Sequence, residues 1–164
     1  MGDIKVNEVK TDTIKSQAGT IYNFVKQAVS NKITESSVSG DTRPSGNGTY
    51  TDTGLSQTIT PSSASSKILI LTCGLFYMRR IEEVRFRFMR DSTAIMTMPG
   101  YSETSDGFFT MPAPSGHLDS PNTTSAVTYK LQFYAQSNYT SLRFNYGGSA
   151  GLGEASMTLL EIAG

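Results

Sequence analysis

Side chains of the types that carry out acid–base catalysis are scarce in this chain, and their spacing does not suit a catalytic site. His117 is the only histidine. It lies among Pro, Ser and Gly residues, which predicts a solvated turn residue rather than a general base. Glu82 and Glu83 are adjacent, so on a strand they point to opposite faces, unlike the facing pair of a glycosidase. No Gly-x-Ser-x-Gly motif marks a nucleophile. We therefore expect no enzyme, and a glycan-acting enzyme that uses these side chains is the weakest alternative.

The motifs that bind phosphate or metal are incomplete as well. The glycine cluster at 147–153 is followed by Glu154, where a phosphate-binding loop needs lysine. A dinucleotide fingerprint needs glycine or alanine where Ser156 stands. No Cys/His spacing fits zinc and no acidic loop fits calcium, so we expect neither a cofactor nor a metal. The single cysteine, Cys73, lies in an apolar run, which predicts a buried and inert thiol.

Length and composition predict one neutral domain with a short appendage. The chain has 164 residues, of which 37% are apolar and only 17% charged, and this length corresponds to about one domain. Fourteen basic residues balance fourteen acidic ones, so nothing favours nucleic acid or an anionic membrane as a partner. No apolar run approaches the roughly 18 residues that span a bilayer, and no secretory signal opens the sequence. We expect a protein made in a cytoplasm that leaves it by assembly into a particle.

The first 33 residues differ from the rest of the chain. Their early part holds only spaced apolar residues, too few to form a core, so residues 1–33 are predicted to pack on another protein as an anchoring segment. The candidate anchoring residues are Ile4, Val6, Val9 and Ile14.

A change of spacing after Thr20 predicts a helix over 20–33, capped by Thr20 or Ser16. The apolar stripe consists of Ile21, Phe24, Val25, Ala28, Val29 and Ile33. Two alternatives stay open. The helix lies on its own domain, or it meets symmetry mates, because so short a helix is only marginally stable alone.

Composition then marks a linker at 34–48 and a β-domain at 49–164. Ser, Thr, Gly, Asn and Pro dominate the linker, and β-forming residues at 49–61 predict a strand that Pro61 stops. The continuous apolar run at 67–77 is typical of a strand buried on both faces.

The remainder of the domain alternates apolar and polar residues in short segments. Such alternation occurs at 84–88, 127–135 and 142–146, and a last strand at 157–162 is expected to lie in the middle of the domain. Six to nine short strands at this spacing predict an all-β fold, a β-sandwich of the jelly-roll type.

Two surface features stand out within the β-domain. The arginines are concentrated at Arg79, Arg80, Arg85, Arg87 and Arg90. Ion pairing across a subunit contact is favoured for them over phosphate binding, because the planar guanidinium suits interfaces. The predicted loop at 96–117 gathers aromatic residues and methionines, and part of this apolar content forms a candidate contact surface. Its members are Tyr101, Phe108, Phe109 and His117.

Several segments together resemble a known group of proteins. They are 51–70, 90–95, 118–121, 124–130 and 159–163, with 4–7 and 11–14 near the start. Their order resembles the C-terminal β-domain and the opening of tail-fibre-like virion proteins of aquatic bacteriophages, notably cyanophages. The resemblance implies a non-enzymatic virion protein whose jelly roll is a homotrimeric knob, carried on other virion proteins by its N-terminal segment. The shaft of such fibres is nearly missing here, so a capsid decoration or head-fibre protein is the alternative.

A trimer is also physically sensible, because closed assembly hides strand edges. The candidate trimer contacts are Ile21, Phe24, Val25, Ala28, Arg85 and Arg87. Multivalent display would then turn weak contacts with host surface glycans into useful avidity.

Overall fold

The part of the chain that the computed structural model describes is all β. It comprises residues 25–34, 49–79, 84–99, 108–112, 115–135, 141–144 and 154–164. Within these residues there are eleven strands and no helix. The strands are β1 (Val25–Thr34), β2 (Thr51–Ile59), β3 (Lys67–Cys73), β4 (Leu75–Arg79), β5 (Val84–Arg90), β6 (Thr93–Pro99), β7 (Phe108–Pro112), β8 (His117–Asp119), β9 (Val127–Ala135), β10 (Ser141–Phe144) and β11 (Glu154–Ile162).

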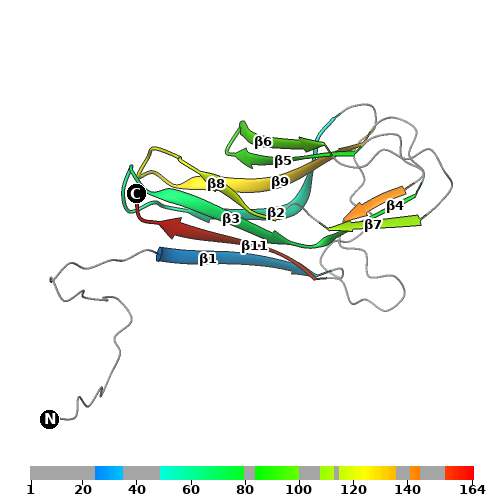
Figure 1. Ribbon diagram of the computed structural model, residues 1–164, viewed down its shortest axis with the longest axis horizontal. Coiled ribbons are helices and arrows are strands. Elements are labelled where there is room, and N and C mark those ends of the chain that lie inside the picture. The colour runs from blue at the N-terminus through cyan, green and yellow to red at the C-terminus, as the bar shows by residue number, and fades with distance from the viewer. Residues whose placement is uncertain are drawn as a thin grey trace, which may run out of the picture.

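Two four-stranded antiparallel sheets form the layers of a sandwich (Figure 1). One has the order β1-β11-β3-β8 and the other β2-β9-β5-β6. Among these eight strands, taken in chain order, the first pairs with the eighth, the second with the seventh, the third with the sixth and the fourth with the fifth. A long antiparallel hairpin that is rolled up gives this pairing, which is the topology of a jelly roll. The predicted β-sandwich is confirmed, and β11 lies between β1 and β3 as expected for an interior strand.

The apolar run at 67–77 differs from its prediction of a strand buried on both faces. It is divided by Gly74 into β3 and β4, and β3 alternates, with Ile68 and Ile70 buried while Leu71 is 40% exposed. Gly74 permits the close approach of an aromatic ring, since a Cβ there would lie 2.8 Å from Cζ of Phe144. Beyond this break, β4 joins β10 and β7 in a third, three-stranded sheet at one end of the sandwich (Figure 1).

The helix predicted over 20–33 is wrong for residues 25–33, which form most of β1. Apolar residues four apart, such as Val25 and Val29, share one face of a helix, but an even spacing also suits a strand. β-Branched side chains favour the strand, and pairing along β11 gives every other backbone group of β1 a partner. A bulge between Val25 and Gln27 turns Val25 outward, whereas Val29 packs against the core. Residues 1–24 and 35–48 lie outside the described part, so the division into anchor, linker and β-domain stays a prediction.

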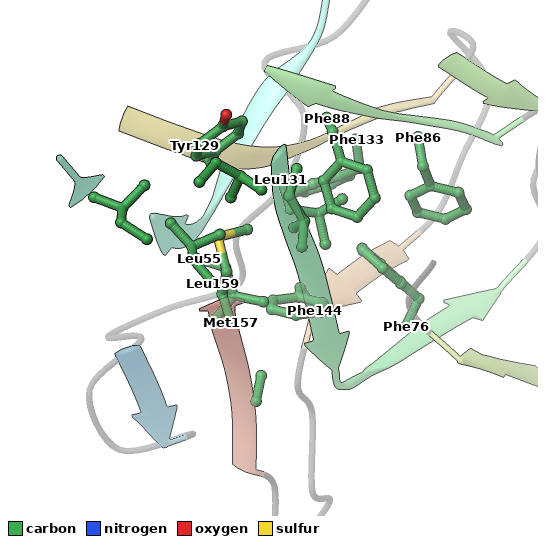
Figure 2. Close-up of a cluster of buried hydrophobic side chains, with 14 of the residues drawn as sticks. Leu55, Phe76, Phe86, Phe88, Tyr129, Leu131, Phe133, Phe144, Met157 and Leu159 are labelled. Atoms are coloured by element: carbon green, nitrogen blue, oxygen red, sulfur yellow. The ribbon is translucent and has the colours of Figure 1, made fainter. Parts of the chain in front are cut away.

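The core lies between the two sandwich sheets and extends into the third sheet (Figure 2). Phe76 of β4 contacts three other rings, with centroid distances of 4.5 Å to Phe86, 5.6 Å to Phe133 and 4.6 Å to Phe144. These residues come from β4 and β10 of the third sheet and from β5 and β9 of the β2-β9-β5-β6 sheet, so one aromatic cluster joins these two sheets. The remaining buried apolar side chains are Leu55, Ile59, Ile68, Ile70, Val84, Phe88, Val127, Tyr129, Leu131, Ala155, Met157 and Leu159.

A bulge in β2 brings polar groups into the interior without leaving them unpaired. Gly54 has a φ of 92°, and the register between β2 and β9 shifts between Asp52 and Ser56. The buried hydroxyl of Thr53 donates to the carbonyl of Leu131 at 2.9 Å and accepts from the amide of Leu55 at 3.2 Å. A glycine is needed here because its φ lies in the left-handed region.

Candidate functional site

The outer face of the β2-β9-β5-β6 sheet carries a row of polar side chains joined by hydrogen bonds. Asp52, Gln132 and Arg87 are partners across β2, β9 and β5 in the registers of these strands. Gln132 donates through Nε2 to Oδ1 of Asp52 at 2.5 Å, and Nε of Arg87 donates to Oε1 of Gln132 at 2.7 Å. Lys130 lies beside the row, with Nζ 3.6 Å from Oδ2 of Asp52. The side-chain amide of Gln132 therefore links the carboxylate of Asp52 to the guanidinium of Arg87, and these hydrogen bonds fix the three groups in one row.

A second row, of aromatic and basic side chains, lies next to the first. The rings of Tyr50 and Tyr134 are 5.4 Å apart between centroids. The guanidinium carbon of Arg87 lies 3.8 Å from the centroid of Tyr50, and that of Arg85 lies 5.3 Å from the centroid of Tyr134. Cation–π attraction holds such pairs together at separations below about 6 Å. The two rows, Asp52–Gln132–Arg87 and Tyr50–Tyr134–Arg85, are called the polar–aromatic face below.

The polar–aromatic face presents several groups to solvent. Arg85 and Asp52 are exposed, and the other four side chains are half-buried. Within the described residues, neither the Nη groups of Arg87 nor the hydroxyls of the two tyrosines have a hydrogen-bond partner. This surface is therefore able to offer ring faces, donors and acceptors to a ligand.

The opposite side of the sandwich has a different character. On the outer face of the β1-β11-β3-β8 sheet, Ala28, Leu160, Leu69 and Leu118 are aligned in register across all four strands. Leu118 is 49% exposed, a far larger fraction than that of any residue in the core. Leu69 and Leu160 are half-buried, and Ala28 is exposed. These four residues, together with the exposed Val25 and Leu71 on the same sheet, are called the apolar face below.

Cys73 follows Leu71 on the outward side of β3, and its thiol is exposed. The prediction of a buried thiol is therefore wrong. It assumed a strand covered on both faces, whereas β3 is covered on one face only among the described residues.

A buried polar network joins the two sandwich sheets. Asp119 of β8 accepts from Nη1 of Arg90, at 3.0 Å to each carboxylate oxygen, and from the hydroxyl of Tyr129 at 2.7 Å. Arg90 and Tyr129 belong to the other sheet, so this network spans the core. Nη1 of Arg90 also donates to the carbonyl of Ser120 at 3.1 Å. Every polar atom named here has a partner, which indicates a structural rather than a catalytic role.

This network predicts a specific loss of stability in alkali. Burial, and then the hydrogen bond to Asp119, raise the pKa of Tyr129 well above its usual value of 10. Above pH 10 the hydroxyl ionises in the unfolded chain but not in the folded one, so unfolding releases a proton and stability falls as pH rises. The expected slope from this residue is about 1.4 kcal/mol per pH unit above pH 10, and zero below it. Urea unfolding of wild type and Tyr129→Phe between pH 8 and 11 measures it, because the other tyrosines are common to both proteins. Parallel pH profiles would contradict the assignment.

Of the residues weighed for acid–base catalysis in the sequence, the described part contains only His117. His117 lies in β8, half-buried, with its ring 6.3 Å from that of Phe88 and nearly parallel to it. It is thus a strand residue packed on the core, and the prediction of a solvated turn is wrong. Glu82, Glu83 and the glycine cluster at 147–153 lie outside the described part. In that part, no three His, Cys, Asp or Glu side chains gather closely enough to hold a metal ion.

The structure separates the candidate contact residues. Val25 and Ala28 lie on the sheet of the apolar face, while Arg85 and Arg87 lie on the other sheet, so they do not form one continuous patch. Phe108 and Phe109 lie in β7, within the predicted loop at 96–117, which also contains the end of β6 and the start of β8. Arg90 pairs within its own chain. Outside the described residues are Ile4, Val6, Val9, Ile14, Ile21, Phe24, Arg80 and Tyr101.

Tyr50, Asp52, Gln132 and Tyr134 are absent from the sequence-based candidates. The alternation at 127–135 does place Gln132 and Tyr134 on the polar side of their strand. Their neighbours Tyr50 and Asp52 could be found only with the register between β2 and β9, which a bulge shifts.

No protein-family model matches the chain, and no curated protein matches it. Among solved structures it is similar to a chain of the infectious bursal disease virus Gx strain, with 14% sequence identity and a TM-score of 0.42, over 92% of this chain and 42% of that one. A chain of the Gt strain shows 13% identity and a TM-score of 0.40, over 99% of this chain and 41% of that one. A chain of the VP2 subviral particle of the same virus shows 11% identity and a TM-score of 0.33, over 99% of this chain and 42% of that one. The chain thus spans about two fifths of these viral chains. A likeness this low does not indicate function. The described part also holds no helix that is long and apolar enough to cross a membrane.

Proposed function

We propose that this chain is a non-enzymatic structural protein of a bacteriophage particle, three copies of which form a short fibre that projects from the particle and contacts the host surface. The fold supports this proposal as an association, because jelly rolls are common in viral capsid and lectin domains, although a fold alone does not imply a function. The resemblance of the chain's segments to tail-fibre-like virion proteins supports it independently.

The apolar face is the observation that carries the proposal of self-assembly. The strands β1, β11 and β3 are ten, nine and seven residues long and β8 is three. At about 4.8 Å between strands and about 3.3 Å per residue, the outer sheet face measures on the order of 400 Å², and the polar Thr158 and Lys67 also lie on it. Exposed apolar patches of a few hundred Å² mark contact sites on soluble proteins. Further copies of the chain are suitable occupants, because a closed ring of three copies would bury the apolar face of each copy against a neighbour.

The purified full chain is expected to have a native mass about three times the 17.8 kDa of one chain. Leu118→Glu is expected to reduce this mass to that of a single folded chain, because assembly would then bury a carboxylate in an apolar contact. Light scattering after size-exclusion chromatography measures both masses. The thiol of Cys73 provides a second measurement, since it should react faster with a disulfide reagent in the variant than in wild type.

Thr97→Glu is the matched control, because Thr97 is exposed on β6 of the other sheet. It adds the same charge away from the apolar face and should leave the mass unchanged. A wild-type chain that stays monomeric at all concentrations would overturn the trimer, and equal dissociation by both variants would overturn the assignment of the contact to the apolar face.

The location on the particle is tested separately. Antibody labelling of purified phage by electron microscopy is expected at a projecting fibre, in few copies. Dense labelling over the shell would favour the decoration protein instead, and absence of the protein from purified particles would overturn the proposed virion role.

A further inference from the structure

The polar–aromatic face combines three kinds of group that favour a sugar as ligand. The ring of Tyr134 provides an apolar face for the C–H side of a pyranose, and the hydroxyls of Tyr134 and Tyr50 stay available at its edge. The adjacent row of Asp52, Gln132 and Arg87 provides planar acceptors and donors. Planar side chains of this kind suit neighbouring hydroxyl groups, each of which both donates and accepts.

The charge of the face narrows the class of sugar. Among the described residues of the face and its neighbour Lys130, the positive charges of Arg85, Arg87 and Lys130 outnumber the negative charge of Asp52, although the whole chain is neutral. Gln132 holds the guanidinium of Arg87 through Nε, which orients the group in a fixed direction. A guanidinium whose Nη groups stay available binds a carboxylate with paired, charge-assisted hydrogen bonds.

Single-stranded nucleic acid also combines rings and charge, but it suits this face less well. Binding of that kind needs ring faces open to stacked bases and cations along the phosphates. Here a guanidinium already lies 3.8 Å from the centroid of Tyr50. The carboxylate of Asp52 stands in the polar row, where it repels the regularly spaced phosphates of a strand. A saccharide can instead place hydroxyl groups beside Asp52 and its acid group at Arg87.

We infer that the polar–aromatic face binds a saccharide that carries a carboxylate, with the pyranose against the ring of Tyr134 and the acid group at Arg87. This inference rests on the proposed function, since it names the chemistry of the host surface that the fibre would contact. A single site of this open kind is expected to be weak, with a Kd of about 1 mM, and three copies on one fibre would raise the avidity.

Isothermal titration calorimetry of the full chain with oligogalacturonate tests the inference. The methyl ester of the same oligosaccharide is the matched ligand, because it keeps the sugar and removes the charge. Binding of the acid is expected to be at least about tenfold tighter than binding of the ester. Arg87→Gln and Tyr134→Ala are each expected to weaken it at least about tenfold, and Arg87→Lys to restore only part of the loss.

Lys67→Gln is the matched protein control. Lys67 is exposed on β3 of the other sheet, so its substitution removes one positive charge without touching the polar–aromatic face. Its affinity should equal that of wild type. Thermal unfolding confirms that each variant is folded, and Arg87→Lys keeps the test valid should Tyr134→Ala not fold.

Four results would overturn the inference. The first is that the acid does not bind at about 10 mM, and the second is that the acid and the ester bind equally tightly. The third is that Lys67→Gln weakens binding of the acid as much as Arg87→Gln does. The fourth is that poly(U) binds more tightly than the acid and that Arg87→Gln and Tyr134→Ala abolish this binding. Titration of the isolated chain does not depend on where the protein lies on a particle. A negative titration therefore leaves the virion role standing, and a negative result with particles leaves the sugar site standing.

Discussion

Replacing Phe76 with alanine is expected to lower the free energy of unfolding by about 3 to 5 kcal/mol, the largest effect of any single substitution considered for this chain. Phe76 is fully buried and contacts Phe86, Phe133 and Phe144 with centroid distances of 4.5 to 5.6 Å. Its removal leaves a cavity where the third sheet packs on the β2-β9-β5-β6 sheet, and it also removes ring–ring contacts that add to simple burial. Urea unfolding measures the change, and the melting temperature should fall by roughly 6 to 20 °C.

Phe76→Leu is the appropriate comparison, because it keeps an apolar side chain in the same space. It should cost clearly less than the alanine variant, about 1 to 2 kcal/mol. Thr97→Ala, on the exposed side of β6, should change stability by less than about 0.5 kcal/mol. A loss below about 1 kcal/mol for Phe76→Ala would mean that the third sheet is not packed on the sandwich as described.

Replacing Asp119 with alanine is expected to cost about 2 to 4 kcal/mol. The substitution leaves the hydroxyl of Tyr129 buried without an acceptor and removes both carboxylate oxygens from Arg90. The upper range for buried ion pairs is not expected, because 28% of the Arg90 side chain remains exposed and water can partly replace the carboxylate. The measurement is the free energy of unfolding at neutral pH.

The exposed pair of Lys130 and Asp52 supplies the control for this experiment. Their charged atoms lie 3.6 Å apart and their side chains are 37% and 50% exposed. Lys130→Ala should therefore cost less than about 1 kcal/mol. Equal costs for Asp119→Ala and Lys130→Ala would show that the network across the core contributes no more than a surface ion pair. A double-mutant cycle with Tyr129→Phe then isolates the hydrogen bond between Tyr129 and Asp119.

The alternation of apolar and polar residues was sufficient to predict the sandwich. β5, β9 and β10 follow the predicted segments closely, and β11 takes the interior position predicted for the last strand, with Glu161 as the charged residue on its buried side. The buried carboxylate of Glu161 is satisfied by the amide and hydroxyl of Ser62, at 2.8 and 2.7 Å. Local periodicity carries this information, because a strand covered on one face needs only a pattern of period two.

Features that depend on pairing between distant segments could not be predicted in the same way. β1 was taken for a helix because its apolar spacing suits both structures, and only its pairing with β11 decides between them. Leu71 and Cys73 are exposed because no further layer covers their side of β3 among the described residues. The sequence of β3 alone does not indicate whether such a layer exists. The contact between Tyr50 and Tyr134 depends on the register of two strands that lie far apart in the sequence.

The pairing of β1 with β11 also has a consequence for how the chain acquires its fold. Val29 of β1 pairs with Leu159 of β11. Among the described strands β1 is synthesised first and β11 last, so β1 cannot pair until synthesis is almost complete. Closing so long a loop costs chain entropy before any contact repays it, and folds dominated by distant pairing form slowly. During that delay the apolar side chains of β3 and the open edge of the sheet are accessible to other nascent chains. Synthesis of several copies close together would favour correct assembly over aggregation only if the sheet closes before the copies meet.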